Sequence, residues 1–365
     1  MLPRREGLRI AAFVLAMFAA GCGGGSTDGG LQSTLLSGSD STQQEILPLK
    51  VNCRILTQCL DLNQASVSSF KGGKKAAASY TFDDGYPSSF AIADMFEARG
   101  LRASFYIIAG AVADDQWASW QDLLARGHEI GNHSMTHTID LGMPDLTPDQ
   151  LNTEIVQSQK LLADKLGSKP LVFAFPWHSS TPQARALALQ THIAIRTPTD
   201  DLPFTLAFFD LNHGTPEDTM ATVNQQLADM VDQGGWYVAA GHGIDGDGWS
   251  PVSSQFLNDH LDYAQGFGDD LWIDTFVNVA RYQVCRKQAA LQVDFSSSSQ
   301  VRLSLNGNFD PACTEPLTVQ IPTLASGISG VVVRDASGTQ LPVRKTAGIW
   351  MVDVLPGQTV SVVAK

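Results

Sequence analysis

The chain has 365 residues, 44% of them hydrophobic, and carries a formal net charge of −13. This length and apolar content are typical of a globular protein with roughly two domains and a targeting segment. The acidic balance, with no basic stripe along the sequence, argues against a nucleic-acid partner.

The first 22 residues have the layout of an export signal. Three arginines precede the apolar run IAAFVLAMFAAGC, which is too short to span a bilayer as a mature helix. The run ends in FAAGC, which resembles a bacterial lipobox and predicts lipidation of Cys22. Ala19 stands where Leu is commoner, so ordinary secretion or a short anchor is the alternative. We therefore expect an exported protein that is lipid-anchored in the bacterial cell envelope or otherwise secreted.

The next segments lead from this signal to the first folded domain. Residues 23–50 are rich in Gly, Ser and Thr, which predicts a flexible tether. Residues 51–74 form a lead-in to that domain.

Four cysteines remain if Cys22 carries lipid, and an even number in an exported chain predicts two disulfides. Three pairings are open, and proximity in the sequence favours Cys53–Cys59 and Cys285–Cys313.

Residues 75–287 alternate short apolar runs with longer amphipathic ones. Helices are expected at 87–100, 113–127 and 147–167, the last with Thr147 as N-cap, Pro148 in the first turn and Gly167 at its end. Strands are expected at 76–82, 102–108, 128–132, 171–175, 192–196, 205–210, 236–242 and 271–276.

This alternation predicts βαβ units in a mostly parallel sheet. A closed or partly closed (β/α) barrel fits the number of units better than the alternative, an open doubly wound sheet. In either fold the catalytic groups lie at the carboxyl ends of the strands. Polar residues do stand at the carboxyl ends of several expected strands, among them Asp83, Asp84, Arg196 and His242. We expect these side chains to lie together in one site at that end of the strands.

Residues 288–365 change character. Short alternating strands separated by Gly, Pro and Ser predict a small β-sandwich. A sugar-binding module needs aromatic platforms, and this segment holds only Phe295, Phe309 and Trp350. Packing or spacing is therefore favoured over sugar binding for this domain.

The sequence TFDDGY places Asp83 and Asp84 side by side at the end of the first expected strand. Like charges repel, and buried carboxylates are costly unless something pairs with them. A surface turn is one interpretation, because Asp-Gly is a common turn signal. A metal ligand beside a general base is the other.

The sequence GHEIGNHSMTH supplies His133 and His137. On a helix or a tight helical turn, this i, i+4 spacing puts both imidazoles on one face, within reach of one ion. Catalytic zinc typically takes three protein ligands and leaves a position for water. Two histidines thus need one carboxylate, and the acid pair offers one plus a spare that can accept a proton from the water.

The sequences TFDDGY and HSMTH together resemble the motifs of the polysaccharide deacetylase family, the NodB-homology group of metal-dependent carbohydrate esterases. The resemblance covers about residues 75–287 and implies a distorted (β/α) barrel. It also implies that Asp83 is the catalytic base and that Asp84, His133 and His137 bind the metal.

The third family motif is only partly present. FAFPWHSS is similar to an Arg-x-Pro-Tyr-like motif at Pro176 and Trp177, but Ala174 stands where the Arg is expected. We expect Arg196 to supply this cation to Asp83, an ordinary salt bridge being the alternative. The family's Asp-rich Trp motif has no clear counterpart.

The last family motif, Leu-x-Leu-x-His, is similar to VAAGH, with Val238 and Ala240 at the apolar positions. The resemblance implies that His242 is the general acid; a packed core histidine is the alternative.

The implied reaction is hydrolysis of N-acetyl groups from a polysaccharide containing N-acetylglucosamine. A divalent metal activates water, Asp83 accepts a proton, His242 protonates the leaving amine, and a backbone N–H near Tyr86 helps to hold the oxyanion. Zn²⁺ suits the ligand set best, with Co²⁺, Ni²⁺ and Mn²⁺ as alternatives. An O-deacetylase, a small-molecule amidohydrolase and a silent glycan-binding lipoprotein stay open. Beyond the glycan and a membrane reached through the lipid, no partner is predicted.

Overall fold

The computed structural model describes residues 60–209, 216–297, 300–324 and 330–364. The expected signal peptide at 1–22, lipidation of Cys22, the tether at 23–50 and the Cys53–Cys59 pair all lie outside the described residues. In the described part of the chain, no helix combines the length and the apolar character needed to cross a membrane.

Eight parallel strands form one sheet. They are β2 (Ala76–Asp84), β3 (Ser104–Ile107), β4 (Glu129–Asn132), β5 (Val172–Phe173), β6 (Ala194–Ile195), β7 (Thr205–Phe208), β8 (Trp236–Gly241) and β9 (Leu271–Ile273). Their order is β6-β5-β4-β3-β2-β8-β7, with β9 paired to the first residues of β2. Every expected strand of this region is thus confirmed.

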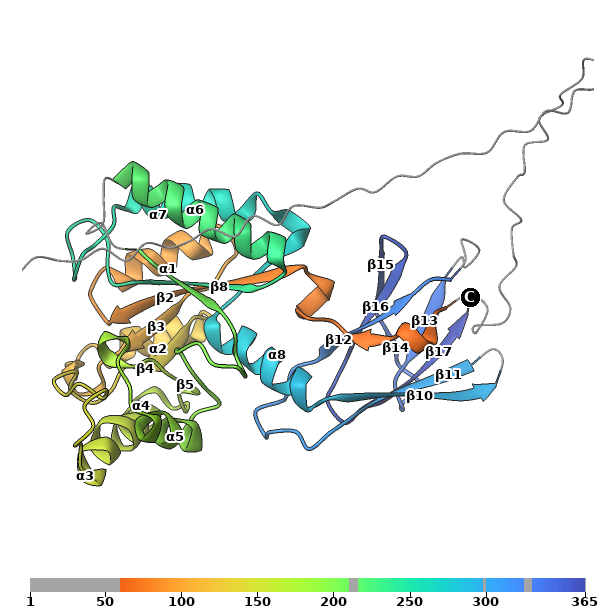
Figure 1. The fold of residues 1–365 in the computed structure, drawn as a ribbon, viewed down its shortest axis with the longest axis horizontal. Helices are drawn as coiled ribbons and strands as arrows, with labels where there is room; N and C mark the ends of the chain where they lie inside the picture. The colour runs from red at the N-terminus through yellow and green to blue at the C-terminus, as the bar shows by residue number, and fades with distance from the viewer. Residues whose placement is uncertain (1–59, 210–215, 298–299, 325–329, 365) are drawn as a thin grey trace, which may run out of the picture. The chain divides into compact units, whose positions relative to one another are not determined.

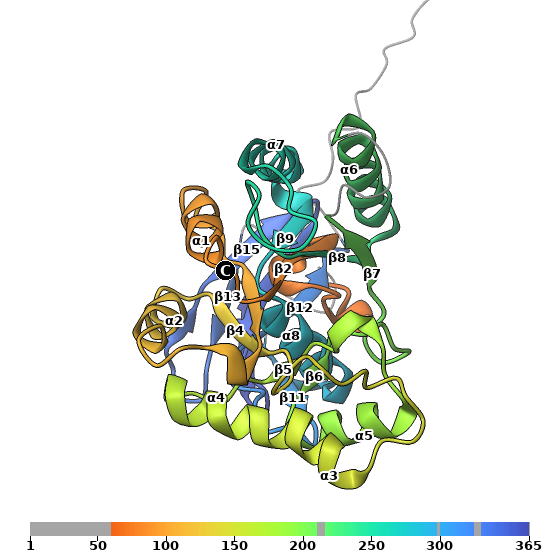
Figure 2. The ribbon, with the colours of Figure 1, turned by 90° about the vertical axis from the view of Figure 1, so that its left-hand side faces the viewer.

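Helices surround these strands, as Figure 2 shows for α1, α2 and α4 to α7. The helices are α1 (Ser89–Glu97), α2 (Trp117–Ala125), α3 (Pro148–Leu151), α4 (Ser158–Leu166), α5 (Pro182–Thr191), α6 (Pro216–Gln233), α7 (Ser254–Gln265) and α8 (Phe276–Gln288). A π-helical segment, Asn152–Gln157, joins α3 to α4. The long helix expected at 147–167 is therefore present, with a capping box at Thr147 and a left-handed Gly167 at its end.

The central strand β2 is buried on both faces, and its side chains alternate between them. Tyr80 and Phe82 pack with Phe96 of α1 in one core, on the side of the surrounding helices. Ala77 packs in a second core with Phe276 and other residues of α8. Counting in twos from Ala77 along β2 places Asp83 on the same face as α8, inside the curved sheet.

The sheet curls far enough to bring distant strands into contact. Strands β6 and β2 are four positions apart, which in a flat sheet would be about 19 Å. Yet Arg196, directly after β6, donates to Asp83 Oδ1 at 2.6 Å. β6 and β7 end the described sheet and do not pair with each other. The fold is therefore the expected distorted (β/α) barrel, and the open-sheet alternative is wrong.

A two-sheet β-sandwich follows the barrel in the chain (Figure 1). Its strands are β1 (Ser66–Val67), β10 (Ala290–Ser297), β11 (Gln300–Asn306), β12 (Leu317–Pro322), β13 (Val331–Arg334), β14 (Gln340–Leu341), β15 (Val343–Thr346), β16 (Ile349–Val354) and β17 (Thr359–Ala364). The sheets have the orders β1-β12-β16-β15 and β10-β11-β17-β13-β14. Trp350 and Phe309 pack in or against the core, so of the three aromatic residues only Phe295 is exposed.

The described part of the lead-in segment, from Leu60 on, belongs to the sandwich, which the sequence did not indicate. Strand β1 pairs with β12, and Leu60 and Leu62 are buried in the sandwich core. From the barrel side, α8 contributes Tyr282 to the same core.

The predicted disulfide between Cys285 and Cys313 is confirmed. It ties α8 to the segment between β11 and β12. The bond closes a loop with a sequence separation of 28 residues.

Replacing both Cys285 and Cys313 by Ser removes this cross-link. We expect the free energy of unfolding of the sandwich to fall by about 3–4 kcal/mol, because without the cross-link the unfolded chain has a higher conformational entropy. Urea-induced unfolding of the non-reduced wild type and the double variant measures this. An unchanged unfolding midpoint would contradict the prediction.

Candidate active site

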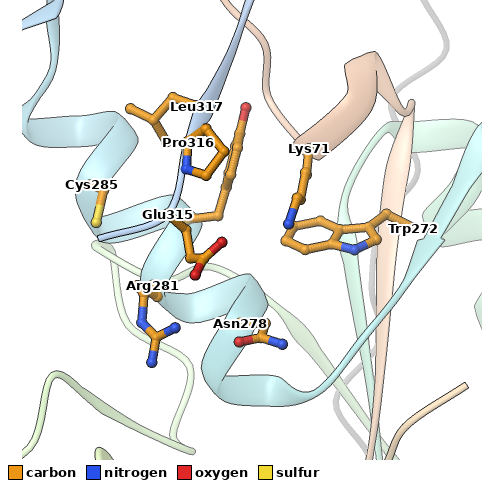
Figure 3. A pocket seen from close by; sticks show the side chains of 9 residues that line it. Lys71, Trp272, Asn278, Arg281, Cys285, Glu315, Pro316 and Leu317 are labelled. Carbon is orange, nitrogen blue, oxygen red and sulfur yellow. The ribbon is translucent and has the colours of Figure 1, made fainter. Parts of the chain in front are cut away.

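A cavity of about 830 Å³ opens at the carboxyl ends of the barrel strands. This volume lies in the range usual for small-molecule and cofactor sites. Its lining includes Asp83, Asp84, His133, His137 and His242. A smaller cavity of about 160 Å³, next to α8 and shown with Lys71, Trp272 and Glu315 in Figure 3, holds no comparable group of ligands. We therefore take the larger cavity as the candidate active site.

The two adjacent acids reach one cavity because the backbone turns between them. In a regular strand, successive side chains point to opposite faces of the sheet. Asp84 has a φ of 70°, in the left-handed region, and Gly85 follows with a φ of 78°. This turn breaks the alternation at the end of β2, so that both carboxylates line the cavity. Asn and Asp adopt this conformation more readily than other non-glycine residues.

Asp83 forms a bidentate ion pair with Arg196. Arg196 donates to Oδ1 at 2.6 Å and to Oδ2 at 2.5 Å, and both side chains are almost fully buried. Arg196 also donates to the Thr81 hydroxyl at 2.8 Å and stacks over the Tyr106 ring at 5.0 Å. Burial alone would raise the pKa of Asp83, but Arg196 and the nearby His133 outweigh it and hold that pKa well below its ordinary value.

Asp84, His133 and His137 form the one group in the described part of the chain whose side-chain donors could hold an ion together. Asp84 Oδ1 lies 3.5 Å from Nε2 of His133 and 3.6 Å from Nε2 of His137. Two ligands of a tetrahedral zinc ion are about 3.4 Å apart. Asp84 Oδ1 is buried without a hydrogen-bond partner. The three residues thus fit a divalent cation, which would satisfy this oxygen.

His133 is oriented for such a role by its other ring nitrogen. Its Nδ1 donates to the carbonyl of Ala174 at 2.8 Å, which leaves the lone pair on Nε2 facing Asp84. Histidine ligands of metals are commonly fixed in this way. Ala174, at the position where the family motif has Arg, therefore contributes its backbone, and the guanidinium comes from Arg196.

The expected helical geometry of the histidine pair is wrong. His133 directly follows β4, and His137 lies in a non-helical loop with a φ of 56°. Two contacts shape this loop: Ser134 Oγ accepts from the N–H of His137 at 3.0 Å, and Glu154 accepts from the N–H of Thr136 at 3.0 Å. The spacing of four residues works here because the loop, rather than a helix, folds back.

His242 follows β8 and lines the same cavity. Its ring stands against Trp249 with 5.0 Å between the ring centroids, and its Nδ1 is buried without a hydrogen-bond partner. The alternative, a core histidine with all of its hydrogen bonds made, does not hold.

The remaining predicted residues divide into two groups. Tyr86 and Trp177 line the cavity. Pro176, Val238 and Ala240 are buried and are not among the described residues that line it; Val238 belongs to the core around α8.

Several residues at the site were not anticipated. Trp249, Phe208 and His178 line the cavity, and the side chains of Trp249 and Phe208 are exposed. Trp249 could have been suspected from its place in the Gly- and Asp-rich loop after His242. Glu154 lies in the π-helical segment of an otherwise ordinary amphipathic helix, and no local pattern marks it.

Comparison with known proteins bears on the segment that carries the candidate metal ligands. Residues 71–195 match the family model described as polysaccharide deacetylase. The match supports the polysaccharide deacetylase family. The matched segment contains Asp83, Asp84, His133 and His137, whereas Arg196 and His242 lie beyond it.

Two curated relatives are similar in sequence to this chain, one over 287 residues and the other over 126. A gellan lyase from Bacillus sp. is 24% identical over 287 residues, which is 70% of this chain and 11% of that protein. A peptidoglycan-N-acetylglucosamine deacetylase from Bacillus cereus is 27% identical over 126 residues, which is 33% of this chain and 43% of that protein. The chain therefore spans less than half the length of both relatives.

Among solved structures, a family 4 acetyl xylan esterase from Clostridium thermocellum in complex with a cobalt ion is 20% identical, with a TM-score of 0.43. The similarity covers 56% of this chain and 89% of that one.

The Asp83–Arg196 pair can be tested with Arg196→Met, which leaves a buried carboxylate without its cation. We expect the free energy of unfolding to fall by about 3–5 kcal/mol at pH 7, and Asp83→Asn to lower it by a similar amount. The double variant is expected to be more stable than the sum of the two single losses implies. Urea unfolding with a chelator present measures all three. Arg344→Met, which breaks an exposed pair with Asp353, serves as the control and is expected to cost under about 1 kcal/mol. Additive losses in the double variant would contradict coupling.

Proposed function

We propose that the protein is a metal-dependent deacetylase that hydrolyses N-acetyl groups on a polysaccharide. One observation carries the proposal: a charged carboxylate locked on Arg196 lies beside a separate group of two histidines and one carboxylate, in a cavity that also contains His242. The family match supports the same reaction class.

Asp84, His133 and His137 would hold the cation, and two nitrogens with one carboxylate oxygen favour Zn²⁺. When bound, such an ion supplies Lewis acidity, which acidifies a water molecule and polarises the acyl carbonyl.

Asp83 accepts the proton of the attacking water in this proposal. Arg196 donates one hydrogen bond to each of its oxygens, and each oxygen keeps a further acceptor site. A carboxylate with so low a pKa is a weak base, so it acts as a fixed, always ionised acceptor for a water that is already acidified.

His242 completes the proton balance. The water oxygen forms a bond to the acyl carbon, the carbon–nitrogen bond breaks, and His242 donates a proton to the departing amine. Acetate and a free amino sugar are the products. A backbone N–H near Tyr86, in the turn after the two acids, would help to stabilise the negative charge on the acyl oxygen.

A polysaccharide substrate is supported by the exposed aromatic side chains at the cavity. Trp177, Phe208 and Trp249 are 56%, 44% and 54% exposed and line the same cavity, and exposed apolar side chains gathered in one place are typical of ligand-binding surfaces. The Bacillus cereus relative is named for deacetylation of a glycan. Export and a lipid anchor at Cys22 would give the enzyme access to such a polymer.

The decisive assay measures acetate release from an N-acetylglucosamine oligomer by the full chain loaded with Zn²⁺. We expect Asp83→Asn and His242→Asn to lower kcat by about 10²- to 10⁴-fold with zinc binding retained. Asp84→Asn is expected to lose both zinc and activity, and Asp114→Asn, an exposed acid, to change neither.

Full turnover in Asp83→Asn or His242→Asn would refute the assigned roles. Release only from acetylated xylan would indicate an O-deacetylase, and release only from small amides an amidohydrolase. Tight zinc binding with no release from any substrate would indicate a silent glycan binder.

A further inference from the structure

His178 combines a strained backbone conformation with a ring nitrogen that has no hydrogen-bond partner. It has a φ of 55° and follows Trp177 with a φ of 51°, so two consecutive non-glycine residues are left-handed. Each such residue is strained by about 1–3 kcal/mol. Glycine would relieve the strain, because it adopts this conformation without penalty. A bulky side chain kept at such a position points to a function.

The ring of His178 is also poorly satisfied. Its Nδ1 is buried without a hydrogen-bond partner, while its side chain lines the candidate active site. Burial, with a contribution from Arg196, lowers the pKa of His178 to about 4, so the ring is neutral at pH 7.

Buried histidines elsewhere in the described part of the chain behave differently. Each has a hydrogen-bond partner at both ring nitrogens: His128 with the Ala103 N–H and Glu97, His192 with Ala188 and Asn132, and His260 with Asn224 and Tyr80. The unpaired nitrogen of His178 is therefore a property of this site and not of buried histidines in general.

We assign Nε2 to the cavity side of the ring, because the His178 side chain lines the cavity while Nδ1 is buried without a partner. An unpaired N–H in a buried environment is rarer than an unpaired acceptor. The proton is thus best placed on Nε2, where it faces the cavity as a hydrogen-bond donor. The ring stands against exposed Phe208, 4.8 Å between centroids, and directly follows exposed Trp177 in the chain.

We propose that His178 is a substrate-positioning residue that donates a hydrogen bond from Nε2 to an oxygen of the sugar ring bearing the acetyl group. This inference rests on the proposed function and deepens it. Because the bond holds the sugar in the ground state and the transition state alike, it contributes to KM and leaves kcat unchanged.

Three substitutions separate this role from a structural one. His178→Gly removes the donor and relieves the strain; we expect KM and the Kd for the oligomer to rise about five- to tenfold, with kcat within about twofold. His178→Gln places an amide N–H near the position of Nε2 and is expected to restore wild-type values. His178→Asn is too short and is expected to resemble Gly.

Stability provides the control. Thermal unfolding of His178→Gly is expected at or above the wild-type midpoint, because glycine accepts the left-handed backbone. Ala347→Gly relieves the same kind of strain at an exposed turn of the sandwich, with a φ of 48°, and is expected to leave KM unchanged.

Each measurement uses the full chain, with acetate release from an N-acetylglucosamine oligomer and calorimetric binding of that oligomer to metal-free protein. Unchanged Kd and KM in His178→Gly, or a loss confined to kcat, would overturn the proposal for His178. Wild type that binds the oligomer without releasing acetate would overturn the proposed reaction, and the Kd series would still decide the role of His178. Wild type that neither binds nor reacts would overturn both.

Discussion

The buried ion pair between Asp83 and Arg196 is the interaction on which the site depends. It joins two strands four positions apart in the sheet, so it can form only when the barrel curls. It also removes the electrostatic conflict between two adjacent acids. With the charge of Asp83 matched by Arg196, the charge of Asp84 is available for a cation that His133 and His137 could hold with it.

Backbone strain is concentrated around the same cavity. Of the eight non-glycine residues with positive φ in the described ranges, four line it (Asp84, His137, Trp177 and His178), and two more, Ser134 and Ser250, directly follow lining residues in the chain. Each is costly in isolation. Around the histidine loop the compensation is visible, because Glu154 and Ser134 hold the backbone that presents His137. At Asp84 the strained turn is what brings the second carboxylate into the cavity.

The sequence predicted what depends on local pattern. Alternating apolar runs located the barrel strands, the capping residue Thr147 and Gly167 bounded a long helix, and the acids and histidines stood at strand ends. Features that depend on distant contacts were harder to predict. Arg196 is 113 residues from Asp83; their pairing was expected because the motif Arg is replaced by Ala174, but the folded barrel was needed to show the buried contact with both carboxylate oxygens. The same holds for β1, whose partner β12 lies about 250 residues away in the chain. The histidine loop was expected to be helical, because the spacing alone does not show that its backbone N–H groups donate to Ser134 and Glu154.

In the proposed reaction, the two adjacent acids have two different tasks. The most direct test is a crystal structure of the full chain with Zn²⁺, using anomalous scattering to locate the ion. We expect one peak bonded by Asp84 Oδ1 and by Nε2 of His133 and His137, with both oxygens of Asp83 still on Arg196. An ion bonded by Asp83, or an Asp83 released from Arg196, would contradict this division of roles.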